Sequence, residues 1–246
     1  YDALIGSWIG SHHFKGQINS VKVFRKAFTT QEMADLSNCA LDQDMNHANA
    51  ADALFYGNDG TLLNGAAISS GALMLDGTDD RVNLARPSSL EINDGSVSVI
   101  ARIKLGTTPN QYSGIITKGA GSSTNAGYAF VYYQPTGDLR FPVCNGTSRQ
   151  TLNSNGNLNL HDDAWHTVGV SLDRGAANSA TFYVDGSPVG SEALSIAGSF
   201  TNAAYDALIG SWVGSHHFKG QIDRIKIYKR TLSGTEMQNI ANQWNR

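Results

Sequence analysis

The sequence is short of several things, and each shortage narrows the choice of protein class. Only two of the 246 residues are cysteine, and a chain of this length can bury a core that needs no disulfide staples. Charged residues make up 16% and the formal net charge is -3, so no basic patch points to a nucleic-acid partner. No run of about 18 apolar residues is present, so we expect no membrane insertion.

The paired carboxylates of a glycosidase are also missing. A retaining glycosidase needs two carboxylates about 5 Å apart, typically delivered by one strand as Glu-x-Asp-x-x-Glu. None of the four glutamates belongs to such a run. We therefore expect a non-catalytic chain. The remaining enzymatic alternative is a polysaccharide lyase, whose base and charge neutraliser would come from Tyr128, Tyr132, His166 and Arg140.

A repeated stretch is the main positive feature of the chain. Residues 1–19 and 205–223 are nearly identical, with Tyr1 and Tyr205 opening the two copies. Apolar runs at residues 207–209 and 218–228 flank a turn-rich segment, which predicts a β-hairpin. Ser or Thr followed three residues later by Glu then predicts a capped helix. The repeat indicates that residues 1–38 are the C-terminal hairpin and helix of a preceding unit, and that residues 39–246 form a complete domain.

An isolated hairpin is only marginally stable in water. We therefore expect residues 1–38 to dock, either on the main domain or on a neighbouring chain, and the second arrangement would produce self-association.

The rest of the chain is patterned as short strands separated by turn clusters. Residues 96–105 alternate cleanly, so Val97, Val99, Ala101 and Ile103 are predicted to face a core. Residues 61–68 read as one strand, and the convincing helix spans residues 235–244. This pattern predicts an all-β fold, an antiparallel two-sheet jelly-roll sandwich with a short C-terminal helix.

Five motifs in a fixed order resemble one known family. They are residues 72–82 (ALMLDGTDDRV), 165–173 (WHTVGVSLD), 182–186 (FYVDG), 209–210 (IG) and 218–228 (FKGQIDRIKIY). Together they resemble the laminin-G-like, concanavalin A-like jelly roll. The resemblance implies a secreted protein that binds glycans, as a lectin or a carbohydrate-binding module. Other relatives bind proteins in matrix or adhesins, and a few are hydrolases or lyases, so the fold alone does not decide.

Aromatic and polar residues of the repeated loop and one strand are the expected sugar contacts. Aromatic faces would cover the apolar patches of sugar rings, while histidine and arginine would bond hydroxyls or an acidic group. The residues are Trp212, His216, His217, Tyr128, Tyr132 and Arg140. Other roles stay open: Trp212 packed on its hairpin, the tyrosines as one face of a half-buried strand, and the histidine pair as a polar or metal-binding pair.

Calcium is a further expectation. The resemblance implies a structural ion held by a carboxylate at the position of Asp223 together with backbone carbonyls. Asp76, Asp79 and Asp80 are loop carboxylates of a type that suits a hard cation. The alternative for Asp76 is a turn aspartate that accepts hydrogen bonds from its own backbone.

A disulfide and a glycosylated asparagine are features of extracellular proteins, and the sequence offers one candidate for each. A Cys39–Cys144 bridge would close a loop of roughly a hundred residues and add on the order of 4 kcal/mol. The alternative is two unrelated buried thiols. Asn145-Gly-Thr147 forms a glycosylation sequon, as in secreted proteins.

Overall fold

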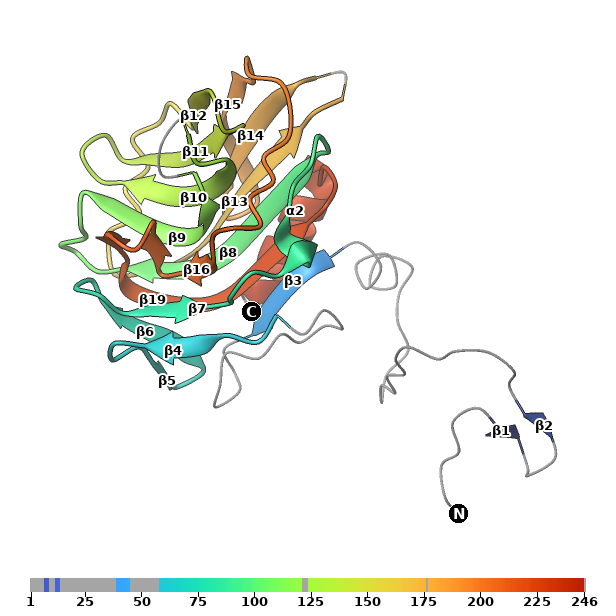
Figure 1. The fold of residues 1–246 in the computed structure, drawn as a ribbon. Helices are drawn as coiled ribbons and strands as arrows, with labels where there is room; N and C mark the ends of the chain where they lie inside the picture. Colours follow the sequence, from blue (N-terminus) through green and yellow to red (C-terminus); the bar gives the residue numbers. More distant parts are fainter. Residues whose placement is uncertain are drawn as a thin grey trace.

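Two antiparallel sheets face each other across one core in the computed structural model (Figure 1). It describes residues 58–120, 124–175 and 177–245, and before them only the backbone of three short strands. One sheet contains β4 (Thr61–Leu63), β7 (Arg81–Asn83), β9 (Tyr112–Gly119), β10 (Gly127–Tyr133), β11 (Asp138–Cys144), β12 (Arg149–Asn153) and β16 (Ala207–Ile209). Its seven strands are ordered β12-β11-β10-β9-β16-β7-β4. The predicted jelly-roll sandwich is confirmed.

The second sheet has eight strands, seven of which form one continuous path. They are β5 (Ala67–Ser69), β6 (Ala72–Asp76), β8 (Val97–Leu105), β13 (Trp165–Asp173), β14 (Ser179–Val184), β15 (Ser187–Ala193) and β19 (Lys219–Tyr228), in the order β15-β14-β13-β8-β19-β6-β5. Strands β8 and β19 therefore lie near the centre of this sheet. The eighth strand, β3 (Cys39–Asp44), lies off this path and pairs with β19.

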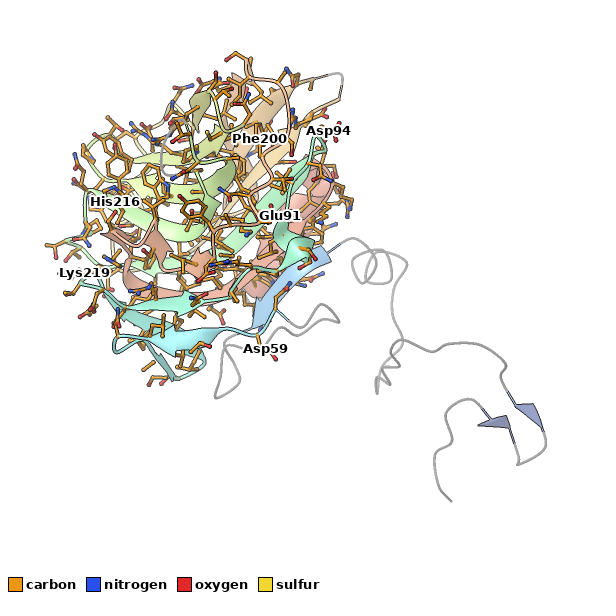
Figure 2. The ribbon with its side chains drawn as sticks, viewed as in Figure 1. Asp59, Glu91, Asp94, Phe200, His216 and Lys219 are labelled. Carbon is orange, nitrogen blue, oxygen red and sulfur yellow. The ribbon has the colours of Figure 1, made fainter. Side chains whose placement is uncertain are left out.

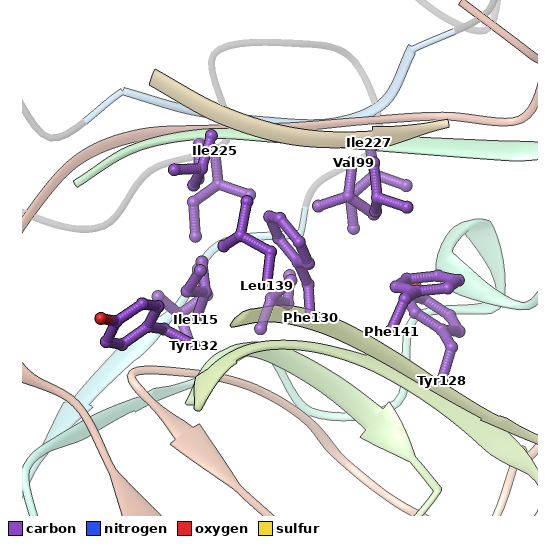
Figure 3. Close-up of a cluster of buried hydrophobic side chains, with 14 of the residues drawn as sticks. Val99, Ile115, Tyr128, Phe130, Tyr132, Leu139, Phe141, Ile225 and Ile227 are labelled. Carbon is purple, nitrogen blue, oxygen red and sulfur yellow. The ribbon is translucent and has the colours of Figure 1, made fainter. Parts of the chain in front are cut away.

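The core lies between the sheets, and Figure 3 shows side chains from both entering it. Val97, Val99, Ala101 and Ile103 are buried there, as their alternation predicts. Phe130 and Leu139 meet them from the seven-stranded sheet (Figure 3). Large buried side chains of this kind stabilise a sandwich by about 1.5–3 kcal/mol each.

Helix α2 (Gly234–Trp244) covers part of the outer face of the eight-stranded sheet. The Ser233 hydroxyl accepts a hydrogen bond from the Glu236 amide, and the Glu236 carboxylate accepts one from Ser233, which confirms the predicted capping box. The apolar stripe of the helix packs with Ile100 and Tyr228 of the sheet. Within the described residues, no helix has the length and apolar character needed to cross a membrane.

Two sequence-based predictions about strands are wrong. Residues 61–68 are not one strand, because Asn64 (φ 63°) and Gly65 (φ 116°) make a turn that sends β4 and β5 to different sheets. Residues 207–209 and 218–228 do not pair as a hairpin either. β16 belongs to the seven-stranded sheet and β19 to the eight-stranded one, so the segment between them crosses from sheet to sheet.

A smaller hairpin lies inside that crossing segment. β17 (Ser211–Trp212) pairs with β18 (His216–His217) in the register Ser211 to His217 and Trp212 to His216. In the first copy of the repeat, β1 (Ser7–Trp8) and β2 (His12–His13) pair in the equivalent register. The repeat therefore extends to backbone pairing. The expected helix and docking of residues 1–38 lie outside the described residues.

Candidate functional site

A cleft of about 600 Å³ opens on the outer face of the seven-stranded sheet. Its floor is a row of neighbours across three strands, since Leu208 of β16 pairs with Asn83 of β7 and with Thr117 of β9. Val82 and Ile116 lie in the core. Because side chains alternate along a strand, their neighbours Asn83 and Thr117 point outward into the cleft.

Two exposed apolar side chains stand on the walls. Tyr205 is 44% exposed, and its hydroxyl donates a hydrogen bond to Asn125 Oδ1 at 3.1 Å. Val213 is 41% exposed and, with Gly214, forms the tip of the β17–β18 hairpin. In the described part of the chain, these two are the only large hydrophobic side chains that are exposed. Both line the same cleft.

A network centred on Asp206 holds the polar side chains of the cleft in place. The Asp206 carboxylate accepts hydrogen bonds from Asn83 Nδ2 at 2.9 Å and from Arg86 Nε at 3.0 Å. The Asn83 bond, with a smaller contribution from Arg86, holds the pKa of Asp206 below its usual value. Asp206 is therefore ionised at neutral pH, and Arg86 is fixed while its side chain remains 62% exposed. Arg81 adds a second guanidinium to the lining.

A buried lysine fixes the wall that carries Tyr205. Lys118 Nζ is fully buried and lies 3.0 Å from Glu91 Oε1, which is labelled in Figure 2. The ammonium also donates to the backbone carbonyls of Asn202 at 2.9 Å and Tyr205 at 2.5 Å. Glu91 in turn accepts a hydrogen bond from the Asn202 amide at 2.6 Å. The segment from Asn202 to Tyr205 is thus held from below at three points.

Trp212 anchors the opposite wall. Its ring packs on Ala129 and Val131 of β10, and the Arg149 guanidinium lies 4.9 Å above it, which leaves Trp212 only 5% exposed. Gly114 of β9 permits this approach, since a Cβ there would lie 2.4 Å from the Ser211 carbonyl carbon. The structure therefore matches the alternative in which Trp212 packs under its hairpin, and it presents Val213 rather than Trp212 to the cleft.

The comparisons with known proteins place this fold in a family. A family model described as "Concanavalin A-like lectin/glucanases superfamily" matches residues 76–238. The chain belongs to the concanavalin A-like lectin/glucanase superfamily. No curated protein is significantly similar to it in sequence.

Solved structures with the superfamily's fold cover most of this chain at low sequence identity. The CBM40 of Ruminococcus gnavus IT-sialidase bound to alpha2,3 sialyllactose has a TM-score of 0.57 at 13% identity, over 69% of this chain and 95% of that one. The botulinum neurotoxin serotype D ligand binding domain in complex with N-acetylneuraminic acid has a TM-score of 0.64 at 13% identity, over 86% and 52%.

The binding domain of Paraclostridial Mosquitocidal Protein 1 has a TM-score of 0.60 at 13% identity, over 85% and 53%. The chain therefore spans about half the length of the toxin binding domains that it matches. At these sequence identities, the similarity is evidence of a shared fold alone.

Two of the expected sugar contacts are core residues in this member of the superfamily. Tyr128 is fully buried, its hydroxyl donates to the Leu90 carbonyl at 3.0 Å, and burial raises its pKa. Tyr132 is also fully buried, and its hydroxyl oxygen lies 2.8 Å from His161 Nδ1. Their expected position at a ligand surface is wrong, because the alternating face of β10 that carries them points inward. A raised pKa is also the opposite of what a lyase base requires.

The other expected contacts lie on the outer face beside the cleft. Arg140 is stacked over Tyr133 at 3.5 Å from the ring centroid and lies 3.5 Å from Asp138. The His216 side chain is labelled in Figure 2. The centroid of its ring lies 5.0 Å from the ring centroid of Tyr112 and 5.2 Å from that of Trp212. Desolvation, followed by the charges of His217 and Arg149, lowers the His216 pKa, so its ring is neutral at pH 7. His217 is buried.

The structure separates the two predicted metal ligands. Asp223 is buried and lies 2.8 Å from an Arg102 nitrogen, with Arg224 at 3.9 Å, so arginines rather than acidic neighbours balance its charge. Asp76 accepts a hydrogen bond from the Thr78 amide at 2.7 Å, as the turn alternative predicts, and it also belongs to a carboxylate cluster with Asp79 and Asp80.

The predicted Cys39–Cys144 bridge is contradicted by the strands that carry the two residues. Cys144 ends β11 in the seven-stranded sheet, whereas Cys39 begins β3 in the other sheet. Facing sheets lie about 10 Å apart, and a disulfide needs Cα atoms within about 7 Å. The Asn145 side chain donates to the Ala197 carbonyl at 2.8 Å and accepts from Thr147, so the structure engages both ends of its amide.

His166 of β13, the other proposed lyase base, lies between the carboxylates of Asp162 and of Asp185, which is in the turn after β14. Its Nδ1 is 2.9 Å from Asp185 Oδ2, and its Nε2 is 3.3 Å from Asp162 Oδ1. The Asp185 hydrogen bond is the main cause that raises the His166 pKa. His166 is not among the residues that line the cleft.

This arrangement predicts a pH dependence of stability. Because the pKa of His166 is higher in the folded chain than in the unfolded chain, its charged form stabilises the fold fully below about pH 6.5. The contribution is lost as pH rises through the folded pKa, and it is at most about 1 kcal/mol because both carboxylates are partly solvated. In urea titrations from pH 5.5 to 8.5, wild type should lose stability relative to His166→Asn. Parallel curves for the two proteins would contradict this assignment.

Val213 occupies a strained backbone position. Val213 has φ 50° and Gly214 φ 70°, and Ser215 N donates to the Trp212 carbonyl at 3.2 Å, so the hairpin tip is a turn with both central residues left-handed. Such turns favour Asn-Gly, whereas a β-branched residue costs about 1–3 kcal/mol. The first copy of the repeat also has a β-branched residue here, Ile9.

We expect Val213→Asn to raise the unfolding free energy by about 1 kcal/mol in urea denaturation, because it relieves this strain. Val213→Ala, which removes the branched side chain but not the left-handed backbone, serves as the comparison and should gain less. A loss of stability in Val213→Asn would show that the turn is not strained.

Most residues that form the cleft were not identified from the sequence. Arg81, Asn83 and Arg86 come from β7 and the segment after it, whereas Tyr205 and Asp206 precede β16. No short motif joins these two regions, because the pairing of β16 with β7 brings them together. One signal was available: Tyr205-Asp206 opens the second copy of the repeat, as Tyr1-Asp2 opens the first.

Proposed function

We propose that this chain is a non-catalytic glycan-binding module and that its sugar site is the cleft between Tyr205 and Val213. The observation that carries the proposal is the composition of this cleft. It places an exposed aromatic ring and an exposed aliphatic side chain above a floor of polar groups that are already fixed by hydrogen bonds. Sugar rings present the matching surface, since their C–H faces stack on aromatic rings and their hydroxyls bond amides, carboxylates and guanidinium groups.

The charges of the cleft favour binding over hydrolysis. Among the described residues that line it, Asp206 is the only carboxylate, and it is paired with Arg86 and Asn83. Hydrolysis by paired carboxylates would need a second acid about 5–9 Å away. Arg81 and Arg86 leave the lining with one positive charge in excess, so sugars that carry a carboxylate fit it best.

Weak single-site affinity would be raised by repetition. Residues 1–19 repeat the stretch that supplies Tyr205 and Val213, with Tyr1 and Ile9 at the equivalent positions. A preceding unit with the same cleft would increase avidity through effective concentration when the glycan is multivalent.

The proposal is tested by a glycan array with the full chain, followed by calorimetric titration of the best ligand. We expect Tyr205→Ala and Arg86→Ala each to lower affinity about tenfold or more, which corresponds to about 1.4 kcal/mol. Arg149→Ala is the matched control, because Arg149 is exposed on the same face but lies over Trp212, outside the cleft. An array without binding, or equal losses in all three variants, would contradict the proposed site.

The same sample separates the alternative functions. The described residues expose no extended apolar patch of the kind expected for a protein-binding adhesion module. A polysaccharide lyase would release unsaturated products that absorb ultraviolet light when uronic-acid polymers are supplied. Product formation would refute the non-catalytic assignment while leaving sugar recognition in place.

A further inference from the structure

Residues 1–18 repeat every core side chain of residues 205–222. The two stretches differ only at Ile9 and Val213, and Val213 is exposed at the hairpin tip. The shared core side chains are Ala207, Ile209, Phe218 and Ile222, with Ala3, Ile5, Phe14 and Ile18 as their counterparts. The second copy therefore shows which surroundings would suit the first.

The backbone of the first copy suits the same surroundings. Gly210 has φ 81°, and a Cβ on it would lie 2.7 Å from Leu75 Cδ1, so this position needs glycine. The first copy has Gly6 there. Strands β1 and β2 also pair in the register of β17 and β18, the hairpin that packs on β9. In shape, residues 1–18 therefore fit the place in the sandwich that residues 205–222 fill.

The match ends at Asp223, whose counterpart in the first copy is Asn19. An oxygen of the Asp223 carboxylate lies 2.8 Å from an Arg102 nitrogen of β8, and these side chains are only 12% and 20% exposed. The Arg102 guanidinium also lies 4.6 Å from the ring centroid of Trp165. Asparagine accepts a hydrogen bond but carries no charge, so Arg102 would lose its ion pair in a largely shielded place. Arg102 therefore favours the second copy over the first.

We propose that the place of residues 205–223 is also a binding site for residues 1–19 of a second copy of this chain, and that the Arg102–Asp223 pair selects between the two segments. Exchange of an identical element between chains is a low-cost route to dimers. A charge that only one segment can neutralise opposes such an exchange. The selection does not depend on glycan binding.

The position of β3 indicates that the exchanged segment comes from another chain. Trp244 ends α2 beside Asp223, since both line one hollow of about 250 Å³. The counterpart of Trp244 is Ala40 of β3, and β3 begins where Cys39 pairs with Tyr228. Tyr228 is about 16 Å from Asp223 along an extended strand. Residue 40 cannot lie at both places, so a segment that brings its predicted helix with it belongs to a second chain.

The proposal is tested by the oligomeric state of the full chain after refolding from urea, measured by light scattering on a size-exclusion column at several chain concentrations. Asn19→Asp gives the first copy a partner for Arg102, so it should raise the dimer association constant about tenfold or more. Asp223→Asn removes the advantage of the second copy and should act in the same direction. Asp163→Asn, which breaks the exposed pair with Lys104, should leave the wild-type distribution unchanged.

Arg102→Met separates this selection from a general loss of stability. Without the guanidinium, a buried aspartate is less favourable than asparagine, so the segment with Asn19 gains and the dimer fraction should rise. Adding Asn19→Asp to Arg102→Met should then lower the dimer fraction, the reverse of its effect beside Arg102. Monomers throughout, or an Asn19→Asp effect that is the same with and without Arg102, would overturn the proposal.

A disulfide locates the interface of the dimer. In the exchanged dimer, Leu4 takes the place of Leu208, which pairs with Thr117 of β9. Chains with Leu4→Cys and chains with Thr117→Cys, both also carrying Asn19→Asp, are mixed in urea and refolded together. Mass spectrometry should find a disulfide between residues 4 and 117 of different chains. A dimer without this disulfide would place the interface elsewhere and contradict the exchange.

Discussion

Lys118→Met lowers the unfolding free energy by about 3–5 kcal/mol in urea denaturation. The substitution keeps the length of the apolar stem but removes a fully buried ammonium group. Glu91, whose side chain is 10% exposed, is then left as an uncompensated buried charge, and the Asn202 and Tyr205 carbonyls lose a donor. Because these carbonyls hold the Tyr205 wall, glycan affinity also falls about tenfold or more in conditions where the variant remains folded.

Lys104→Met is the matched control for Lys118→Met. Lys104 Nζ lies 3.3 Å from Asp163, but that carboxylate is 61% exposed, so the loss is expected to stay below about 1 kcal/mol. The double variant Lys118→Met/Glu91→Gln should recover part of the stability, since glutamine keeps an acceptor for the Asn202 amide and removes the buried charge. A cost below about 1 kcal/mol for Lys118→Met itself would show that the buried pair does not support the wall.

Gly114→Ala separates the β17–β18 hairpin from the sheet. The new Cβ would lie 2.4 Å from both the Ser211 carbonyl carbon and the Trp212 nitrogen, and backbone atoms cannot yield as a flexible side chain does. Overpacking of this kind costs about 1–3 kcal/mol. The hairpin tip forms one wall of the cleft, so glycan affinity falls with stability. Hydrogen exchange at the amides of residues 211–217 should accelerate.

Gly95→Ala is the comparison for Gly114→Ala. A Cβ at Gly95 meets no heavy atom within 4 Å, so stability should be unchanged or slightly higher. If Gly114→Ala kept both slow exchange at residues 211–217 and wild-type affinity, the hairpin would not be clamped on β9 and the cleft would need another explanation.

The sheet core was predictable because its signal is local. In β8, Val97, Val99, Ala101 and Ile103 alternate with other residues, and an alternating strand buries its apolar face. The cap of α2 is also local, since Ser233 and Glu236 lie three residues apart and satisfy each other's backbone groups. Both features were read correctly from the sequence because no distant segment decides them.

The candidate site was not predictable, because contacts with distant segments decide which side chains reach the surface there. Alternation on β10 shows that Tyr128 and Tyr132 share a face but not which face is inside. The sequence analysis did single out the hairpin, whose tip lines the cleft. The side chain that it presents depends on the left-handed backbone at Val213, which no residue preference indicates, because β-branched residues avoid that conformation.

The location of sugar binding is tested most directly by amide chemical shifts of the full chain during titration with the best array ligand. The account predicts that the largest shifts fall on the residues around the cleft: Asn83, Arg86, Gly119, Asn125, Tyr205, Asp206, Leu208, Val213 and Gly214. Amides near Arg140 and Tyr133, on the same face but outside the cleft, should move little. Shifts concentrated at Arg140 and Tyr133, or on the eight-stranded sheet, would contradict it.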